Sequence, residues 1–547
     1  MSIAIHYTAI KPPTGTEREV FGLQVAIADW VTAYMRHARS ETLTFLIGDA
    51  QESDEIRKIA ATAGVDARRL ALLDRRFPER NMASLATVFR PEPDTRNLLW
   101  QRQFYGNFSF CGLAHAISGT EAGDVLQDYI LAPSEPGDAI VCPSHAVRDA
   151  VRAFWDHYAD YLHRRFGATY KCPVQLPVIP LGVDIEKFER RATPDKRAAQ
   201  RRALNIADDE IVLLWVGRLS AAIKAHPLAM FRAAELAAEK TGKKIHLVML
   251  GYFVPAEADI QFRELAAAMC AAARVTFVAA DDQRFPDGLW AAGDIFLSLV
   301  DNCQESFGLT PIEAMAAGLP RVISDWDGYR DSVTDGQDGF LIRTIQPPPG
   351  NGFDLTAQVL NGREVYGGFL AKTALTVAVD AEQAADRIAQ LAQNKDLRAS
   401  IIAKARARLH ATYGWKQVIG RHEDLWQELA VRRRLSPHEK RVWASALPTL
   451  PDPYMMYESY AAARLAESDR VMVAASAAQM EALWANKLNT YGADSLVAPA
   501  SIAALLGFIV EQGGADIAGI FTQFPALDRP ALWRTLGWLL KLGIIAK

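Results

Sequence analysis

Two glutamates separated by seven residues mark the segment with the clearest potential for ligand chemistry. Glu305 and Glu313 lie in the stretch DNCQESFGLTPIEAMAAGLPRVISD, which follows an apolar run. Gly308 permits close backbone approach, and Pro311 suits the first turn of a helix. Such a helix directs free backbone NH groups toward an anion, and flanking carboxylates can accept hydrogen bonds from hydroxyls. The stretch therefore predicts a site for a diphosphate or a sugar.

Both glutamates also have simpler interpretations. Thr310 to Glu313 matches a capping box, in which the glutamate stabilises the helix start and contacts no ligand. Glu305 taken alone is typical of a solvated acid in a loop. These alternatives remain open from the residues themselves.

A second pair of charged residues follows another apolar strand. Arg218 and Lys224 lie in LLWVGRLSAAIKAHP. Arginine offers a bidentate fork to phosphate oxygens and lysine a mobile point charge, so the pair can neutralise a departing diphosphate. Each residue alone would be interpreted as an ordinary surface charge. Their position at strand ends, like that of Glu305, favours a shared site.

The first half of the chain contributes weaker candidates. His115 ends a strand in CGLAHAISG, where a structural role is the simpler interpretation, and Gly15 with Thr16 occupies the first strand-to-helix loop. The phosphate-binding pattern GxGxxG is absent from that loop. These residues would meet the second half only if the two halves face each other.

No metal site is predicted. Asp325-Trp326-Asp327 has the spacing of a metal-binding DxD pair, but a turn after a strand is the simpler interpretation. Histidine or further carboxylate ligands at metal-site spacing are missing from its neighbourhood. The cysteines form neither a CxxC pair nor an obvious disulfide framework, and they are Cys111, Cys142, Cys172, Cys270 and Cys303.

The elements that must position these residues alternate between strand and helix, as in a parallel sheet covered by helices. In the first half the strand candidates are IAIHYTA, TLTFLIG, SFCGLAHA and DAIVCPS, with helical patterns at 18–39 and 54–63. The polar segment 75–101 carries no clear signal. Prolines and a glycine at 177–188 interrupt the pattern and indicate a domain boundary.

A second series begins after this boundary. Its strand candidates are IVLLWV, IHLVML, VTFVA, DIFLSLV and RVISD, followed by a looser insertion that opens with QPPPGN and helices near 381–393 and 414–433. Such continuous apolar strands suit a parallel sheet buried on both faces. Beyond Pro437 the sequence shows helical segments without strand alternation.

Composition and charge set broad limits on function. The chain has 547 residues, a formal net charge of -4 and 23% charged residues. This balance provides no global field to attract nucleic acid or anionic lipid. The first residues lack the features of a signal peptide, so we expect a cytoplasmic protein without a transmembrane segment.

Four motifs together resemble the family 4 retaining glycosyltransferases of GT-B fold. They are GVDIEKF, VGRLS with a following lysine, ESFGLTPIEAMAAGLPRVISD and a downstream DGFLI, within a resemblance that covers about residues 1–430. The order and spacing of the four are specific, although each motif alone is loose.

The resemblance implies a role for each candidate. Glu305 would contact sugar hydroxyls, Glu313 the nucleotide ribose, and Arg218 with Lys224 the diphosphate. His115 would lie beside the transferred sugar. Backbone amides would hold sugar and phosphate, and they belong to Phe307, Gly308 and Leu309. Such enzymes retain the anomeric configuration without metal or cofactor, and the leaving phosphate helps to deprotonate the acceptor.

The sequence departs from the family pattern in two places. Five residues separate Arg218 from Lys224, one more than usual, and Ala-His follows the lysine where glycine is common. The loop KPPTGTERE, which holds Gly15 and Thr16, lacks the usual paired glycines. These departures weaken the phosphate roles of Lys224 and of the first loop.

We therefore expect an α/β protein with two facing Rossmann-like domains and a small, mainly helical C-terminal domain. The first would span 1–180 and receive a returning helix near 414–433, the second would span 181–413 and bind a nucleotide sugar, and the third would span 437–547. The expected function is sugar transfer to a saccharide, lipid-linked or protein acceptor. The alternative is a non-catalytic scaffold that binds a nucleotide sugar or a partner.

The final segment resembles a winged-helix ending. Leucines and tryptophans dominate LDRPALWRTLGWLLKLGIIAK, whereas a DNA-binding helix needs a basic, exposed face. Nucleic acid binding is therefore not favoured. Packing, homo-oligomer formation or a protein partner is the preferred role for this domain.

Overall fold

The computed structural model describes residues 2–9, 22–115, 117–119, 121–435 and 448–547. The chain forms two compact units, Met1–Ala444 and Ser445–Lys547. Gly15 and Thr16 lie outside the described residues, so their predicted phosphate contact stays a prediction.

The first sheet of the larger unit has six parallel strands in the order β3-β2-β1-β4-β5-β6. The strands are β1 (Ile3–His6), β2 (Leu43–Ile47), β3 (Leu70–Asp74), β4 (Thr87–Arg90), β5 (Ser109–Leu113) and β6 (Ala139–Val141). The helices among them are α1 (Gly22–His37), α2 (Ala50–Ala63), η1 (Ala67–Arg69), α3 (Pro78–Asn81), α4 (Leu98–Tyr105), α5 (Ala122–Leu131) and α6 (His145–Phe166). The segment without a clear sequence signal thus contains α3 and β4.

The second sheet repeats this topology with the order β12-β11-β10-β7-β8-β9, again all parallel. Its strands are β7 (Ile211–Val216), β8 (Ile245–Gly251), β9 (Arg274–Ala279), β10 (Ile295–Ser298), β11 (Arg321–Ser324) and β12 (Phe340–Ile342). Its helices are α7 (Ile185–Arg191), α8 (Pro194–Ala203), α9 (Leu228–Thr241), α10 (Ala258–Met269), α11 (Leu309–Ala316), α12 (Tyr329–Ser332), α15 (Ala381–Gln393) and α16 (Lys395–Thr412).

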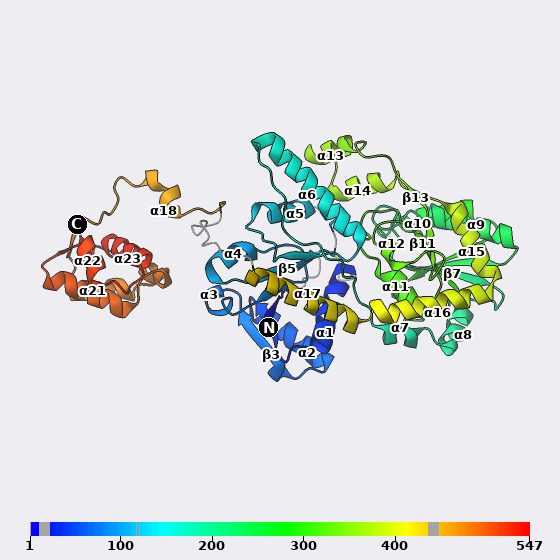
Figure 1. Cartoon of the computed structure of the whole chain (residues 1–547), viewed down its shortest axis with the longest axis horizontal. Coiled ribbons are helices and arrows are strands. Elements are labelled where there is room, and N and C mark those ends of the chain that lie inside the picture. The colour runs from blue at the N-terminus through cyan, green and yellow to red at the C-terminus, as the bar shows by residue number, and fades with distance from the viewer. Residues whose placement is uncertain (1, 10–21, 116, 120, 436–447) are drawn as a thin grey trace. The chain divides into compact units, whose positions relative to one another are not determined.

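Both sheets therefore have the doubly wound order of the Rossmann fold, which confirms the predicted pair of Rossmann-like domains. In such a sheet the order reverses between the first and fourth strands, and ligands bind beside the carboxyl ends of those strands. In the second sheet these are β7 and β10, which pair directly. Figure 1 shows the two sheets of this unit, each with its own helices, the first mostly in blue to cyan and the second mostly in green.

An insertion separates β12 from α15. It contains β13 (Thr344–Ile345), α13 (Phe353–Leu360), α14 (Tyr366–Ala374) and β14 (Ala378–Val379). β13 and β14 pair antiparallel and so close the insertion at its base. The chain thus leaves the second domain and returns to it at one place.

The helix α17 (Trp415–Leu435) lies against the first sheet. Trp426 is buried there beside Phe89, with ring centroids 5.0 Å apart. The Ser109 hydroxyl donates to the carbonyl of Leu429 at 3.1 Å. The chain therefore returns to its first domain after completing the second, which ties the two together.

A buried ionic network fixes the far end of α17. The carboxylate of Asp138 accepts hydrogen bonds from Arg102 at 2.6 and 2.9 Å and from Arg433 at 3.0 Å. It also accepts from the backbone NH groups of Phe110 and Glu135. These contacts hold the pKa of Asp138 below its ordinary value, although burial alone would raise it. One carboxylate thus links α4, β5 and α17.

The smaller unit is mainly helical, as predicted, but it also contains a three-stranded sheet of order β16-β15-β17 that the sequence pattern did not reveal. Its elements are α18 (Pro453–Met456), η2 (Glu458–Tyr460), β15 (Arg470–Val473), α19 (Ala477–Ala485), α20 (Lys487–Thr490), η3 (Ala493–Ser495), α21 (Pro499–Glu511), β16 (Ala515–Asp516), α22 (Ile517–Gln523), α23 (Arg529–Lys541) and β17 (Ile545–Ala546). The strands of two residues are too short to show alternation.

The leucines of α23 point into the core of this unit. Leu532, Leu536 and Leu539 are buried, and Trp533 and Trp538 pack against the same cluster. These side chains are therefore used for packing. Among the described residues no single helix meets the length and apolarity needed to cross a membrane, and one bent pair, Lys487–Ser495 with Pro499–Glu511, meets them only jointly.

We expect Asp138→Ala to lower the free energy of unfolding by about 3 to 5 kcal/mol, because the change leaves two buried guanidinium groups without their central carboxylate. Denaturant unfolding monitored by circular dichroism measures this loss. The matched control is Glu428→Ala on the exposed side of α17, where an ion pair with Arg432 is about half exposed and should contribute less than about 1 kcal/mol. Equal effects of the two changes would contradict this account.

Candidate active site

Lys224 and Glu305 form an ion pair at the carboxyl ends of β7 and β10. Lys224 lies in the loop after β7 and Glu305 in the loop after β10. Their side chains are only 14% and 15% exposed, so the pair is shielded from bulk water. The sequence placed both residues at strand ends, and the structure brings them together at the reversal point of the sheet.

Two polar residues just after β10 hold the Lys224 loop in place. The carboxylate of buried Asp301 accepts a hydrogen bond from the backbone NH of His226 at 3.2 Å. The side-chain amide of Asn302 donates to the carbonyl of Ala222 at 2.5 Å. Burial raises the pKa of Asp301 to about 7. Sequence reasoning did not single out these residues, and their only signal was their place directly after an apolar strand.

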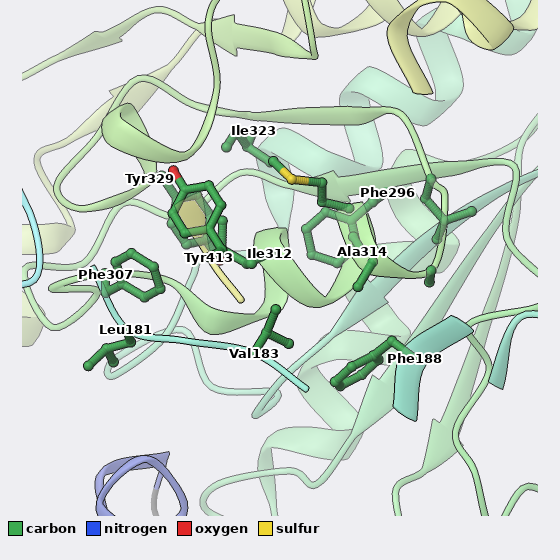
Figure 2. Packing of buried hydrophobic residues seen from close by; sticks show 14 of the residues in the cluster. Leu181, Val183, Phe188, Phe296, Phe307, Ile312, Ala314, Ile323, Tyr329 and Tyr413 are labelled. Atoms are coloured by element: carbon green, nitrogen blue, oxygen red, sulfur yellow. The ribbon is translucent and has the colours of Figure 1, made fainter. Parts of the chain in front are cut away.

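Gly308 fixes the start of α11. Its φ of +85° lies in the left-handed region, and a Cβ atom here would lie 2.3 Å from Cε1 of Tyr329. Tyr329 is itself held by a 2.9 Å hydrogen bond between its hydroxyl and that of Ser298. Figure 2 shows Phe307, Ile312 and Tyr329 among the buried side chains around this helix start. A residue with a side chain would force the loop away from Tyr329.

The loop before α11 rests on a second glycine. The backbone NH of Gly328 donates to the carbonyl of Glu305 at 3.0 Å. A Cβ atom on Gly328 would approach the carbonyl oxygen of Ser306 to 2.3 Å. The close backbone approach holds Glu305 at the helix start, and no local pattern indicated this contact between the two loops.

Glu313 does not cap its helix, and the capping-box interpretation is wrong. The N-cap is Gly308 and no side chain bonds to the helix start, so Glu313 is the fifth helical residue and too far along to cap it. Burial raises its pKa to about 7, although the charges of Lys187 and Arg191 on α7 act in the opposite direction. Its carboxylate therefore lies in a partly buried region with two cations nearby.

His115 comes from the first domain and meets the same loop. The hydroxyl of Ser306 donates to the backbone carbonyl of His115, and the hydroxyl of Ser144 donates to the carbonyl of Ser306 at 2.7 Å. Both ring nitrogens of His115 are buried and have no hydrogen-bond partner among the described residues. Burial lowers the pKa of His115 to about 4, so its ring is neutral near pH 7.

The other predicted residues lie around this centre. Arg218 is partly buried in the loop after β7, and Leu309 is the first residue of α11. The side chain of Phe307 is buried beside Tyr413, with ring centroids 6.2 Å apart. Only the backbone amide of Phe307 is therefore suited to a ligand.

The Asp325-Trp326-Asp327 segment forms the partner loop of the site. Asp325 pairs with Arg330 at 2.8 Å, and Asp327 adopts a φ of +45°. Burial and the charge of Glu305 raise the pKa of Asp327 to about 7. The described residues contain no cluster of three or more histidine, cysteine or acidic side chains suited to a metal ion.

The arrangement as a whole suits an anionic ligand with hydroxyl groups. It combines the cationic side chain of Lys224, a helix N-terminus without a side-chain cap and two carboxylates from one loop and helix. His115 adds a neutral ring from the opposite domain. Groups of this kind can hold a phosphorylated sugar between two domains.

Comparison with known proteins finds similarity in the segment that holds the second sheet. Residues 196–347 match the family model of glycosyl transferases group 1. A D-inositol 3-phosphate glycosyltransferase of Geodermatophilus obscurus is 33% identical over 203 residues, which is 36% of this chain and 41% of that protein. D-inositol 3-phosphate glycosyltransferase 2 of Catenulispora acidiphila is also 33% identical over 203 residues, 36% of this chain and 45% of that protein. The matches span less than half the length of these relatives.

Among solved structures, Anabaena HepE in complex with UDP and glucose covers 78% of this chain and 100% of its own, with 15% identity and a TM-score of 0.48. The match of the family model begins within α8 and covers all six strands of the second sheet and α11, and it includes Arg218, Lys224, Glu305 and Glu313. The second Rossmann-like domain of this chain is thus the part that is similar to the glycosyl transferases group 1.

Proposed function

We propose that this chain transfers a sugar from a nucleoside-diphosphate sugar to an acceptor hydroxyl, with retention of the anomeric configuration and without a metal or cofactor. The observation that carries the proposal is the Lys224–Glu305 pair at the reversal point of the sheet, directly before the free N-terminus of α11. A sugar diphosphate needs a cation for its phosphates and, beside it, a group that accepts hydrogen bonds from the sugar hydroxyls. Lys224 and Glu305 provide these two groups.

The diphosphate would lie between Lys224, Arg218 and the first amides of α11. Its oxygens compete with Glu305 for the ammonium group of Lys224. Glu305 is then released to accept hydrogen bonds from the sugar hydroxyls. Donor binding thus exchanges one shielded ion pair for two sets of charge-assisted hydrogen bonds.

Glu313 is suited to the ribose of the nucleotide. It lies one turn into α11, its carboxylate has no ion pair or hydrogen bond among the described residues, and two hydroxyls on adjacent carbons can donate to one carboxylate. The neighbouring charges of Lys187 and Arg191 favour its ionised form. Ribose binding would satisfy a carboxylate that has no partner among the described residues.

The chemical difficulty of the reaction is departure of the diphosphate, on which negative charge develops. Lys224, Arg218 and the α11 dipole stabilise that charge where it forms. His115 is neutral, so it orients a sugar hydroxyl without competing with the phosphate for charge. The leaving phosphate oxygen then takes the acceptor proton on the face from which it departs, which retains the configuration. The proposed acceptor is a saccharide, a lipid-linked molecule or a protein.

Glu305→Ala is expected to lower kcat/KM for donor hydrolysis about 10- to 100-fold, because it removes the hydrogen bonds that the sugar hydroxyls donate to a charged carboxylate. The assay measures release of nucleoside diphosphate from UDP-, GDP- and ADP-sugars without acceptor. Glu239→Gln, an exposed change on α9, is the matched control and should leave the rate unchanged. Thermal unfolding of each variant shows whether a loss reflects misfolding.

Two results would count against the proposal. Glu305→Ala with full donor hydrolysis and full donor affinity would remove Glu305 from the site. Stabilisation of the wild-type protein by a sugar nucleotide, without product after long incubation, would favour a scaffold that binds the donor and does not turn it over.

Glu313→Gln is expected to weaken nucleoside-diphosphate binding in a pH-dependent way. Since the pKa of Glu313 is raised to about 7, its carboxylate is mostly ionised at pH 8 and mostly protonated at pH 6. The ratio of variant to wild-type Kd should be about 10 at pH 8 and fall to about 3 or less at pH 6. Isothermal titration calorimetry measures the Kd of both proteins at each pH. Ionisation of the nucleotide phosphate affects both proteins alike, so its effect cancels in the ratio.

The same variant has an independent readout in stability. A carboxyl whose pKa is higher in the folded state than its ordinary 4.5 loses protons less readily when folded, so its ionisation destabilises the fold as pH rises from about 4.5 to 7. The Tm of Glu313→Gln relative to wild type should therefore increase between pH 5 and pH 8. A constant Tm difference would show that the carboxyl titrates normally.

A further inference from the structure

A cavity of about 600 Å³ opens beside the loop that carries Glu305. Cys303 and Ser306 of that loop line it, and Ser118 and Val147 line it from the first domain. Its volume is within the range of about 300 to 1,000 Å³ typical of small-molecule sites. Because Ser306 also bonds to the carbonyl of His115, the cavity adjoins the groups assigned to the transferred sugar.

The insertion after β12 builds the outer wall of this cavity. Gln346 follows β13, and Tyr366 and Leu370 lie on α14, and all three line the cavity. The base of the insertion is closed by pairing of Thr344 with Val379. The family match ends at residue 347, so α13 and α14 come after the matched segment. Part of the cavity is thus built by residues outside the segment shared with the family.

The polar lining favours hydroxyl groups over anions. Asp325 and Asp327 bring two carboxylates, whereas Arg330 is the one cationic side chain among the described lining residues and already pairs with Asp325 at 2.8 Å. Trp326 and Tyr366 add aromatic surface. Carboxylates accept hydrogen bonds from hydroxyls, and aromatic rings pack against the apolar CH faces of a sugar. A phosphate here would face more negative than positive charge.

We propose that this cavity binds the acceptor, that the acceptor is a neutral saccharide or polyol, and that α14 determines which one is used. This inference rests on the function proposed above. An acceptor hydroxyl in the cavity would approach the donor sugar past Ser306, while Tyr366 contacts the part of the acceptor that does not react. Tyr366 is therefore a specificity-determining residue outside the donor site.

Transfer to a panel of neutral mono- and disaccharides and to the matching sugar phosphates tests the proposal, with donor hydrolysis measured in parallel. Tyr366→Ala should raise the acceptor KM about tenfold and lower the ratio of transfer to hydrolysis by a similar factor. Tyr366→Phe keeps the aromatic ring and should have an acceptor KM close to that of the wild type. Phe353→Ser, a strongly exposed change on α13 that does not line the cavity, is the matched control and should leave KM unchanged.

The remaining outcomes show whether the proposed function or only the inference about the acceptor fails. If wild-type protein neither hydrolyses nor transfers from any donor, the proposed function itself fails. If it does turn over donor, the inference is overturned by an unchanged acceptor KM in Tyr366→Ala, by equal losses of transfer and hydrolysis, or by a preference for sugar phosphates over neutral saccharides.

Discussion

The left-handed backbone of Gly308, pressed against the ring of Tyr329, decides where α11 begins, and the charged groups of the site take their positions from that point. A Cβ atom would lie 2.3 Å from the ring, so another residue would shift the helix start. With the start fixed, the first amides of α11 stay free of side-chain caps. Glu305 then lies just before the helix and Glu313 one turn into it.

The charges around this helix are balanced within the protein but remain available to a ligand. Lys224 neutralises Glu305 in a shielded pair, and Lys187 and Arg191 partly offset the burial of Glu313. Groups of this kind are costly to bury and cluster at functional sites, because a ligand can replace the internal partner. The pKa values of Glu313 and Asp327 are raised for a related reason, because burial makes ionisation of each carboxyl group unfavourable.

The two halves of the larger unit have the same strand order but different tasks. The second sheet supplies the charged loops after β7 and β10, whereas the first supplies His115 and the anchor of α17. Contacts through Ser144 and Ser306 bring His115 to the α11 loop. The insertion with α13 and α14 then adds a wall beside this shared centre without altering the sheet.

The sequence by itself determined the repeated strand and helix alternation and the charged residues at strand ends, because apolar runs, glycines and prolines act locally. It also identified the motif around Gly308. It could not exclude that Glu313 caps its helix, since the residues Thr310 to Glu313 fit both a capping box and a ligand contact, and only the observed helix start rules out the cap. The short strands of the C-terminal unit, the supports from Asp301 and Gly328, and the cavity beside α14 were decided by tertiary structure. Each depends on contacts between segments far apart in the chain, which no local pattern records.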